Sequence, residues 1–132
     1  MKIQKFEDLE AWKEARQLVR LIYDIINQSE QFKRDYKLKE QLTDAVVSVM
    51  SNIAEGFARR SNKEFVQFLF ISISSASEVQ SLLYVAQDLR YINKESFEGA
   101  YEQASKVSQI NSGLIRYLNS TIKTTRNNGI PK

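Results

Sequence analysis

The stretch of sequence that decides the fold is Ser51-Asn52-Ile53-Ala54-Glu55-Gly56-Phe57-Ala58-Arg59-Arg60-Ser61-Asn62-Lys63-Glu64-Phe65. It reads as the end of one helix, a tight corner and the start of another helix. Gly56 can supply the positive φ that the position after a helix often needs. Ser61 and Glu64 have the S-x-x-E spacing of a capping box, in which each side chain satisfies a free amide at a helix start. We therefore expect one helix to end near Gly56 and the next to begin at Ser61.

A long apolar helix is expected after this corner, as far as about Arg90. Its apolar and small residues recur at the three-and-four spacing of a buried stripe. A second stripe follows the other side, so the helix either forms the core of a bundle or also takes part in a subunit interface. The first stripe contains Phe65, Phe68, Leu69, Ser72, Ala76, Val79, Leu82, Leu83, Ala86 and Leu89, and the candidate interface residues of the second are Val66, Phe70, Ile73 and Tyr84.

Three further helices follow from apolar periodicity and capping residues. The first covers about residues 8–28, with Asp8 as its N-cap; Asp35 caps the second and Asn93 caps the fourth. The connection from Ser29 to Tyr36 is polar, and we expect it to be a loop. Four amphipathic helices with mostly short connections predict an all-α protein, an antiparallel up-down-up-down four-helix bundle over residues 1–123. Residues 124–132 are expected to form a flexible C-terminal tail.

Composition places the chain among globular helical proteins. Its 132 residues suit one domain, 42% of them are hydrophobic, and Pro131 is the single proline. No run of about 18 apolar residues is present, so we expect no membrane span. The N-terminus lacks the apolar core of a signal peptide, and cysteine is absent, which together favour a cytoplasmic location.

The missing residue types argue against catalysis. Without histidine or cysteine, the chain cannot build a Ser-His-Asp or Cys-His catalytic unit, or a zinc site with such ligands. The glycine-rich loops that bind phosphates in nucleotide-binding proteins are also missing. A Mg²⁺ site of carboxylates alone stays open, although no motif marks one. We therefore expect no enzyme activity, no cofactor and no metal.

Two carboxylates near the corner need an explanation. Glu55 lies where a helix C-terminus places negative potential, and Glu78 lies in an otherwise apolar helix. One reading is a structural corner network made of Asn52, Glu55 and Glu78 around Gly56. The other reading is contact with a ligand or a partner.

Basic residues are the candidates for binding a polyanion. Arg59, Arg60 and Lys63 lie within five residues at an exposed corner beside a helix start, a place that suits phosphate oxygens. Arg16 and Arg20 lie on the outer side of the first helix. For that second face, solvation and pairing with nearby acids is the alternative reading.

Several of these motifs resemble a known family. They include Phe6-Glu7-Asp8-Leu9-Glu10-Ala11-Trp12, Gln41-Leu42, the corner Ser51-Asn52-Ile53-Ala54-Glu55-Gly56 with Arg59, and Ser75-Ala76-Ser77-Glu78. The chain resembles the bacterial four-helix-bundle proteins encoded in intervening sequences of large-subunit rRNA genes, which carry a ribosomal-protein label. It is also similar to the accessory variability protein of diversity-generating retroelements. The resemblance implies a barrel-like homopentamer with a basic surface, which in the retroelement branch binds RNA and reverse transcriptase, and no catalysis.

The sequence departs from the family pattern at three places. Thr43 and Asp44 stand where arginine is usual, Ser74 replaces a glycine, and Lys33 replaces a loop proline after Phe32. Two functions are therefore considered. The first is a non-catalytic, homo-oligomeric RNA-associated protein that binds phosphates through Arg59, Arg60, Lys63, Arg16 and Arg20. The second is a protein–protein scaffold that docks a partner protein, such as a reverse transcriptase, without nucleic acid.

Overall fold

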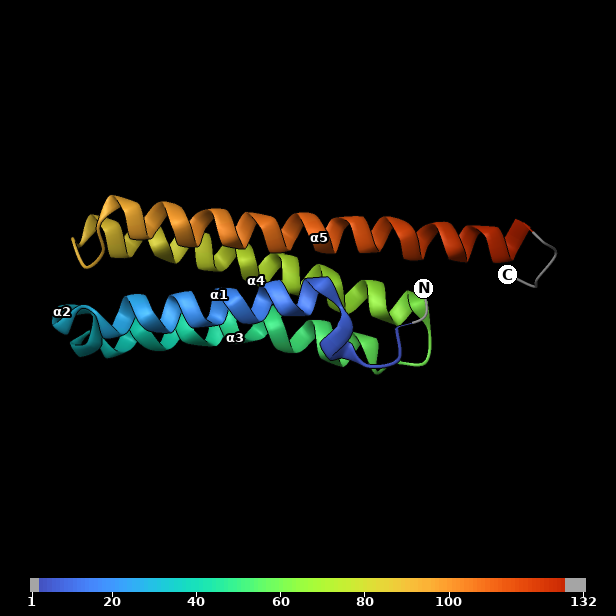
Figure 1. Cartoon of the computed structure of the whole chain (residues 1–132), viewed down its shortest axis with the longest axis horizontal. Coiled ribbons are helices and arrows are strands. Elements are labelled where there is room, and N and C mark those ends of the chain that lie inside the picture. The colour runs from blue at the N-terminus through green and yellow to red at the C-terminus, as the bar shows by residue number, and fades with distance from the viewer. Residues whose placement is uncertain (1–2, 128–132) are drawn as a thin grey trace.

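The structure is a computed structural model that describes residues 3–127, with side chains described as far as residue 121. It is entirely helical over the described residues, which confirms the predicted all-α class. Figure 1 shows four long helices that lie lengthwise beside one another. The elements are a 3-10 helix η1 (Phe6–Asp8) and the helices α1 (Glu10–Asn27), α2 (Glu30–Arg34), α3 (Tyr36–Phe57), α4 (Asn62–Asp88) and α5 (Lys94–Asn127).

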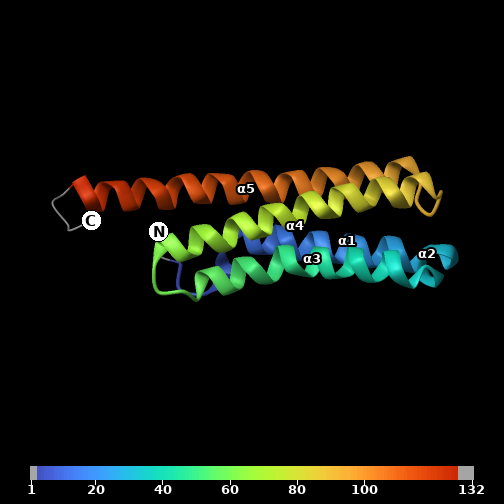
Figure 2. The ribbon, with the colours of Figure 1, turned by 180° about the vertical axis from the view of Figure 1, so that it is seen from behind.

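The four long helices share one hydrophobic core. α3 packs against α1 and α4, while α5 packs against α4 and α1. Figure 2, seen from behind, shows the same neighbours. Each of these helices contributes a stripe of apolar side chains spaced by three or four residues, and burial of these stripes is the main stabilising force. Completely buried examples are Leu18, Ile22, Val46, Val49, Leu69, Leu83 and Val107.

The start of α1 differs from the prediction. Asp8 does not cap the helix; it is exposed and lies inside η1. Leu9 occupies the N-cap position with an extended backbone and makes no side-chain cap hydrogen bond. Leu9 is buried, and the ring of Phe6 packs edge-on against Trp12, with 5.2 Å between the ring centroids. Apolar packing therefore decides where α1 begins.

The connection between α1 and α3 contains the short helix α2, where the sequence predicted a loop. The Ser29 hydroxyl accepts a hydrogen bond from the Phe32 amide at 3.1 Å, so Ser29 is the N-cap. Phe32 is completely buried, and its ring lies 5.3 Å from that of Tyr91. One buried aromatic side chain thus anchors five residues that are otherwise polar.

Three of the predicted caps are confirmed. The Leu38 amide donates to Asp35 Oδ1 at 3.1 Å, the Glu64 amide to Ser61 Oγ at 3.2 Å, and the Ser96 amide to Asn93 Oδ1 at 2.8 Å. Each cap satisfies an amide that has no partner inside its helix.

The C-terminal helix is longer than expected. α5 continues to Asn127, so residues 124–127 are helical, although they were assigned to the tail. Residues 128–132 lie outside the described part of the chain. The flexibility of this segment stays a prediction.

A buried polar contact crosses three helices at one level of the core. The Ser72 hydroxyl donates to the carbonyl oxygen of Val49 at 2.7 Å, and Asn111 Nδ2 donates to Ser72 Oγ at 3.0 Å. Ser72 and Asn111 are both fully buried. Asn111 Oδ1 has no hydrogen-bond partner among the described residues.

Within the described residues, one helix, α4, is long and apolar enough to cross a membrane by length and composition alone. Core helices of soluble proteins pass the same test, and α4 contributes nine buried residues to the core. The expectation that the protein contacts no membrane stays a prediction.

Candidate nucleic-acid interface

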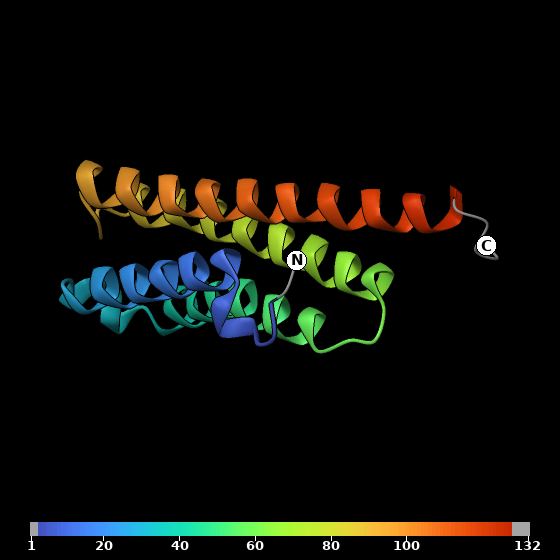
Figure 3. The same cartoon turned by 45° about the vertical axis from the view of Figure 1, so that its right-hand side comes forward.

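The corner between α3 and α4 is the loop at the right-hand end of these two helices in Figure 3, where α5 extends beyond it. Gly56 does not supply a positive φ there: it lies within α3, one residue before its end. A Cβ atom at this position would meet Phe68 Cβ at 2.7 Å and Phe65 Cδ1 at 2.8 Å. Gly56 is therefore required because α3 and α4 approach each other closely, and the predicted reason for the glycine was wrong.

Aromatic side chains fill the inner side of this corner. The rings of Phe57 and Phe65 meet edge-on, with centroids 6.0 Å apart. The guanidinium of Arg59 lies over the ring of Phe68, 4.7 Å from its centroid. Such a cation–π contact holds the side chain in place while its N–H groups remain available to an anion.

The three predicted corner cations lie together on the surface. Arg59, Arg60 and Lys63 are all exposed. The neighbouring acid Glu64 accepts a hydrogen bond from Ser61 at 3.5 Å as part of the capping box. Ion pairs among the described residues join Lys33 to Glu30 and Lys106 to Glu14, so neither includes a corner cation. We call Arg59, Arg60 and Lys63 the corner cations.

Arg16 and Arg20 do not belong to the same cluster. Glu14, two residues before Arg16, is hydrogen-bonded to Gln103, which lies eight residues before Asn111 in α5. Asn111 in turn bonds Ser72, which lies ten residues into α4 from the corner. Adding these offsets along α1, α5 and α4 at 1.5 Å per residue places Arg16 roughly 30 Å along the long axis from the corner. The guanidinium of Arg16 lies 5.7 Å from the ring centroid of Trp12. The five predicted cations therefore form two separate surfaces.

The ion pair near Arg16 perturbs one carboxyl group. Glu14 accepts hydrogen bonds from Gln103 Nε2 at 2.9 Å and lies 3.3 Å from the Lys106 ammonium. The hydrogen bond from Gln103 lowers the pKa of Glu14 most, and Lys106 lowers this pKa further against the opposing effect of burial. This acid neutralises part of the positive charge on the Arg16 side of the molecule.

The predicted corner network has a different membership. Asn52 Nδ2 donates to the Ser48 carbonyl oxygen and to Ser48 Oγ, both at 2.9 Å, and Ser48 Oγ lies 2.8 Å from Ser75 Oγ. Glu55 and Glu78 are exposed, and neither forms a hydrogen bond or ion pair with another described residue. The network therefore contains the hydroxyl groups of Ser48 and Ser75 instead of the carboxylates of Glu55 and Glu78, because closely packed α3 and α4 leave room only for small side chains between them.

The four predicted interface residues fall into two groups. Val66 is buried and Ile73 packs partly against the core, so both serve the monomer. Phe70 and Tyr84 are about half exposed, at 55% and 51%. Two further apolar residues of α4, Ile71 and Val85, and its C-cap Leu89 share this exposure, although none of them was a predicted interface residue. We call Phe70, Ile71, Tyr84, Val85 and Leu89 the outer α4 face.

A second basic surface, which the sequence analysis overlooked, lies at the opposite end of the molecule. It consists of Arg34, Tyr36, Lys37 and Lys39, at the junction of α2 and α3, and we call it the α2 end. The signal was present in the sequence, because basic residues lie within three positions of an aromatic residue on both sides. Reading the region as a plain polar connection concealed it.

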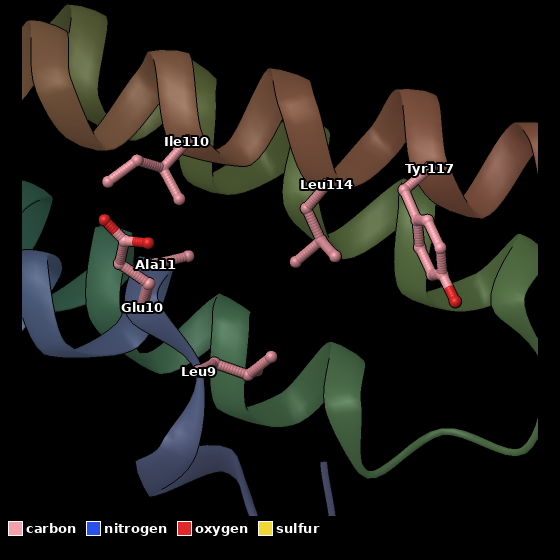
Figure 4. Close-up of a pocket in the computed structure, with 6 residues that line it drawn as sticks. All are labelled: Leu9, Glu10, Ala11, Ile110, Leu114 and Tyr117. Atoms are coloured by element: carbon pink, nitrogen blue, oxygen red, sulfur yellow. The ribbon is translucent and has the colours of Figure 1, made fainter. Parts of the chain in front are cut away.

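An apolar pocket of about 270 Å³ lies between the start of α1 and the middle of α5. Figure 4 shows its lining residues, which are Leu9, Glu10, Ala11, Ile110, Leu114 and Tyr117. Polar groups are few: the Glu10 carboxylate and the Tyr117 hydroxyl. Among the described residues, no group of three or more acidic residues could hold a metal ion. The pocket offers apolar contact and no catalytic arrangement.

Comparison with known proteins accounts for this combination of a helical core and polar corner motifs. Residues 7–113 match the family described as 23S rRNA-intervening sequence protein. The chain belongs to this family. The matched region includes both basic surfaces of this chain, the corner and the α2 end.

One solved structure has the same fold. It is a crystal structure of a protein with unknown function from the S23 ribosomal protein family of Bacteroides thetaiotaomicron. The TM-score is 0.67 at 22% sequence identity, over 80% of this chain and 94% of that one. None of the curated proteins matches the sequence. At this identity the likeness concerns the fold alone.

Proposed function

We propose that this family member is a non-catalytic, homo-oligomeric RNA-associated protein that binds phosphates through the corner cations. In this proposal each subunit is an antiparallel up-down-up-down four-helix bundle that acts in the cytoplasm. A homopentamer is the expected assembly from the family resemblance. No cofactor is required.

The observation that carries the proposal is the state of the corner cations. Arg59, Arg60 and Lys63 are exposed on a short turn that is held by the Ser61 cap and by the close approach at Gly56. They have no acidic partner among the described residues. Positive charges held on a rigid turn lose little conformational freedom when they bind phosphate, which favours binding.

The test is a salt titration of binding between the purified protein and a structured rRNA fragment, with duplex DNA as the control. Each phosphate that a cation neutralises releases counterions, so the affinity should fall steeply as salt is added. Replacing Arg59 and Arg60 by glutamate should reduce both the affinity and the slope of the logarithm of the binding constant against the logarithm of salt concentration. Loss of two contacts corresponds to a slope change of about 2.

The matched control is the double variant Arg16→Glu and Arg20→Glu. It reverses the same number of charges on the other surface, so it separates a local contact at the corner from a general effect of net charge. Equal weakening by both double variants would contradict a specific role for the corner cations. Absence of binding at low salt, where electrostatic attraction is strongest, would contradict the whole proposal.

A second function is supported by the outer α4 face. Five large apolar side chains on one helix are between 41% and 55% exposed. They form two groups along the helix, Phe70 with Ile71 and Tyr84 with Val85 and Leu89, and exposed apolar surface often marks a protein–protein interface. This favours either self-association or a scaffold that docks a partner protein, such as a reverse transcriptase, without nucleic acid. Phe70→Glu should release monomers if the face joins subunits, as measured by light scattering at micromolar concentration. A wild-type monomer would leave partner docking as the use of this face.

A further inference from the structure

The α2 end carries an exposed aromatic ring among positive charges. Tyr36 is 71% exposed, the highest value for a large apolar or aromatic side chain in the described part of the chain. The Lys39 ammonium lies over one side of the ring, 5.6 Å from its centroid. Arg34, two residues before Tyr36, and Lys37, directly after it, are exposed.

The acids of this region are mostly engaged elsewhere. Glu30 pairs with Lys33 at 2.8 Å. One oxygen of Asp35 caps α3, and the other accepts a hydrogen bond from the Tyr91 hydroxyl at 2.9 Å. Glu40, one turn after Tyr36, is the remaining acid of the segment. The three cations Arg34, Lys37 and Lys39 have no ion-pair partner within the described part of the chain.

The backbone that carries Tyr36 is anchored by its neighbours. Phe32 is buried against Tyr91, and the hydrogen bond between Tyr91 and Asp35 ties the α2–α3 junction to the segment after α4. At the same junction, an open hollow of about 330 Å³ is lined by Gln31, Arg34, Asp35 and Tyr91. The hollow offers a guanidinium, an amide and a carboxylate to a ligand.

We propose that the α2 end is a stacking site for single-stranded RNA, in which a base stacks on Tyr36 and neighbouring phosphates contact Arg34 and Lys37. This inference rests on the proposed function and specifies the form of RNA that one surface takes. An exposed ring offers nothing to a duplex, whose base faces are already stacked, whereas unpaired bases gain from it. The corner differs, because Arg59 already covers the ring of Phe68.

The test uses the full chain and a single-stranded RNA of about eight nucleotides with one 2-aminopurine, a base whose fluorescence is quenched by stacking. Wild type should quench this fluorescence and bind. Tyr36→Ala should abolish the quenching and weaken binding roughly five- to a hundredfold, the range seen when a stacking aromatic is removed. Tyr36→Phe keeps the ring and should behave as wild type. Glu40→Gln, which removes the nearby carboxylate, should tighten binding.

Tyr23→Ala is the matched control. Tyr23 is also an exposed tyrosine on a helix, 43% exposed, but its sequence neighbour is the acid Asp24, and one cation, Arg20, lies a turn before it instead of three cations around it. We expect it to bind as wild type does. Circular dichroism of each variant checks the fold, which loss of an exposed side chain should leave intact.

The outcomes separate this inference from the proposed function. If Tyr36→Ala binds the single strand as wild type does, while reversal of the corner charges still weakens binding of the structured rRNA fragment, the stacking site is wrong and the proposed function stands. If neither RNA binds at low salt, both are wrong. If Tyr23→Ala weakens binding as much as Tyr36→Ala, stacking is not localised at the α2 end and the inference is overturned.

Discussion

The corner and the α2 end have the same number of unpaired cations but present them differently. At the corner, the aromatic ring of Phe68 supports Arg59 and is itself half-buried. At the α2 end, the ring of Tyr36 is exposed and Lys39 covers one side of it. The first arrangement offers charge alone, which suits the phosphates of any nucleic acid. The second adds an aromatic surface, which suits an unpaired base.

The two ends are also held together by different interactions. The corner depends on the close approach of two helices at Gly56, while the α2 end depends on the buried side chain of Phe32 and on the hydrogen bond between Tyr91 and Asp35. Similar surface charge can therefore rest on unrelated packing. Stability measurements on matched variants test whether this contrast is real.

The largest expected effect is at the α2 end. Phe32→Ala removes a completely buried aromatic side chain and leaves a cavity beneath Tyr91. We expect the free energy of unfolding, measured with urea, to fall by about 3–5 kcal/mol. A loss below about 1 kcal/mol would show that α2 is not part of the cooperative core, and that its packing does not support the α2 end.

A smaller effect is expected at the corner from Gly56→Ala. The added methyl group would overlap Phe68 and Phe65, so the two helices must separate. Overpacking of this kind costs about 1–3 kcal/mol, which exceeds the gain in helix propensity. Gly99→Ala in α5 is the control, because a Cβ there meets no atom within 4 Å. It should stabilise the protein by up to about 1 kcal/mol. Stabilisation by both substitutions would mean that the close approach at Gly56 is absent.

A serine N-cap at each end allows a direct comparison. Ser29 caps α2 and Ser61 caps α4, with hydrogen bonds of 3.1 Å and 3.2 Å. Each substitution by alanine should lower the free energy of unfolding by about 1 kcal/mol in thermal or urea denaturation. Ser29→Ala should have the larger effect, because Ser29 is the more buried of the two and its cap positions the buried Phe32. The reverse order would assign the greater need for capping to the corner.

The smallest expected effect is a response of the α2 end to alkaline pH. The hydrogen bond to Asp35 raises the pKa of Tyr91 above its usual value, and burial and the Asp35 charge act in the same direction. A pKa raised by folding means that the stabilisation is complete below the unfolded-state pKa and is lost as the pH rises through the folded-state pKa. The urea midpoints of wild type and Tyr91→Phe should therefore differ at about pH 8 and converge above about pH 10. A constant difference would show that ionisation of Tyr91 has no part in the contact.

Local signals in the sequence predicted the fold well. Ser61, Asp35 and Asn93 act as caps because each bonds an amide three residues away, a relation that depends on spacing alone. The apolar periodicity likewise predicted the long helices. Asp8 was the exception, since burial of Leu9 sets the start of α1 instead.

The candidate site was less predictable, because its geometry depends on contacts between helices. The role of Gly56 follows from the position of Phe68 on the next helix, and the polar partners of Asn52 are hydroxyl groups rather than Glu55 and Glu78. The separation of Arg16 from the corner could not be predicted from the sequence either, because it depends on how the helices lie beside one another. The helix α2 could not be predicted from periodicity, because it contains a single apolar residue, Phe32, and a periodic pattern needs several.

The buried contact among Val49, Ser72 and Asn111 fixes how the helices are aligned along their length. Sliding α5 by one turn along α4 would move Asn111 away from Ser72 and leave the buried Asn111 amide without a partner, at about 1–3 kcal/mol, while Ser72 would keep its bond to Val49. The helices are therefore locked in one register, as buried asparagines lock coiled coils. α3 joins the α2 end to the corner, and its 22 residues keep the two basic surfaces roughly 33 Å apart at 1.5 Å per residue. An RNA that contacts both basic surfaces of one subunit must therefore span this fixed distance.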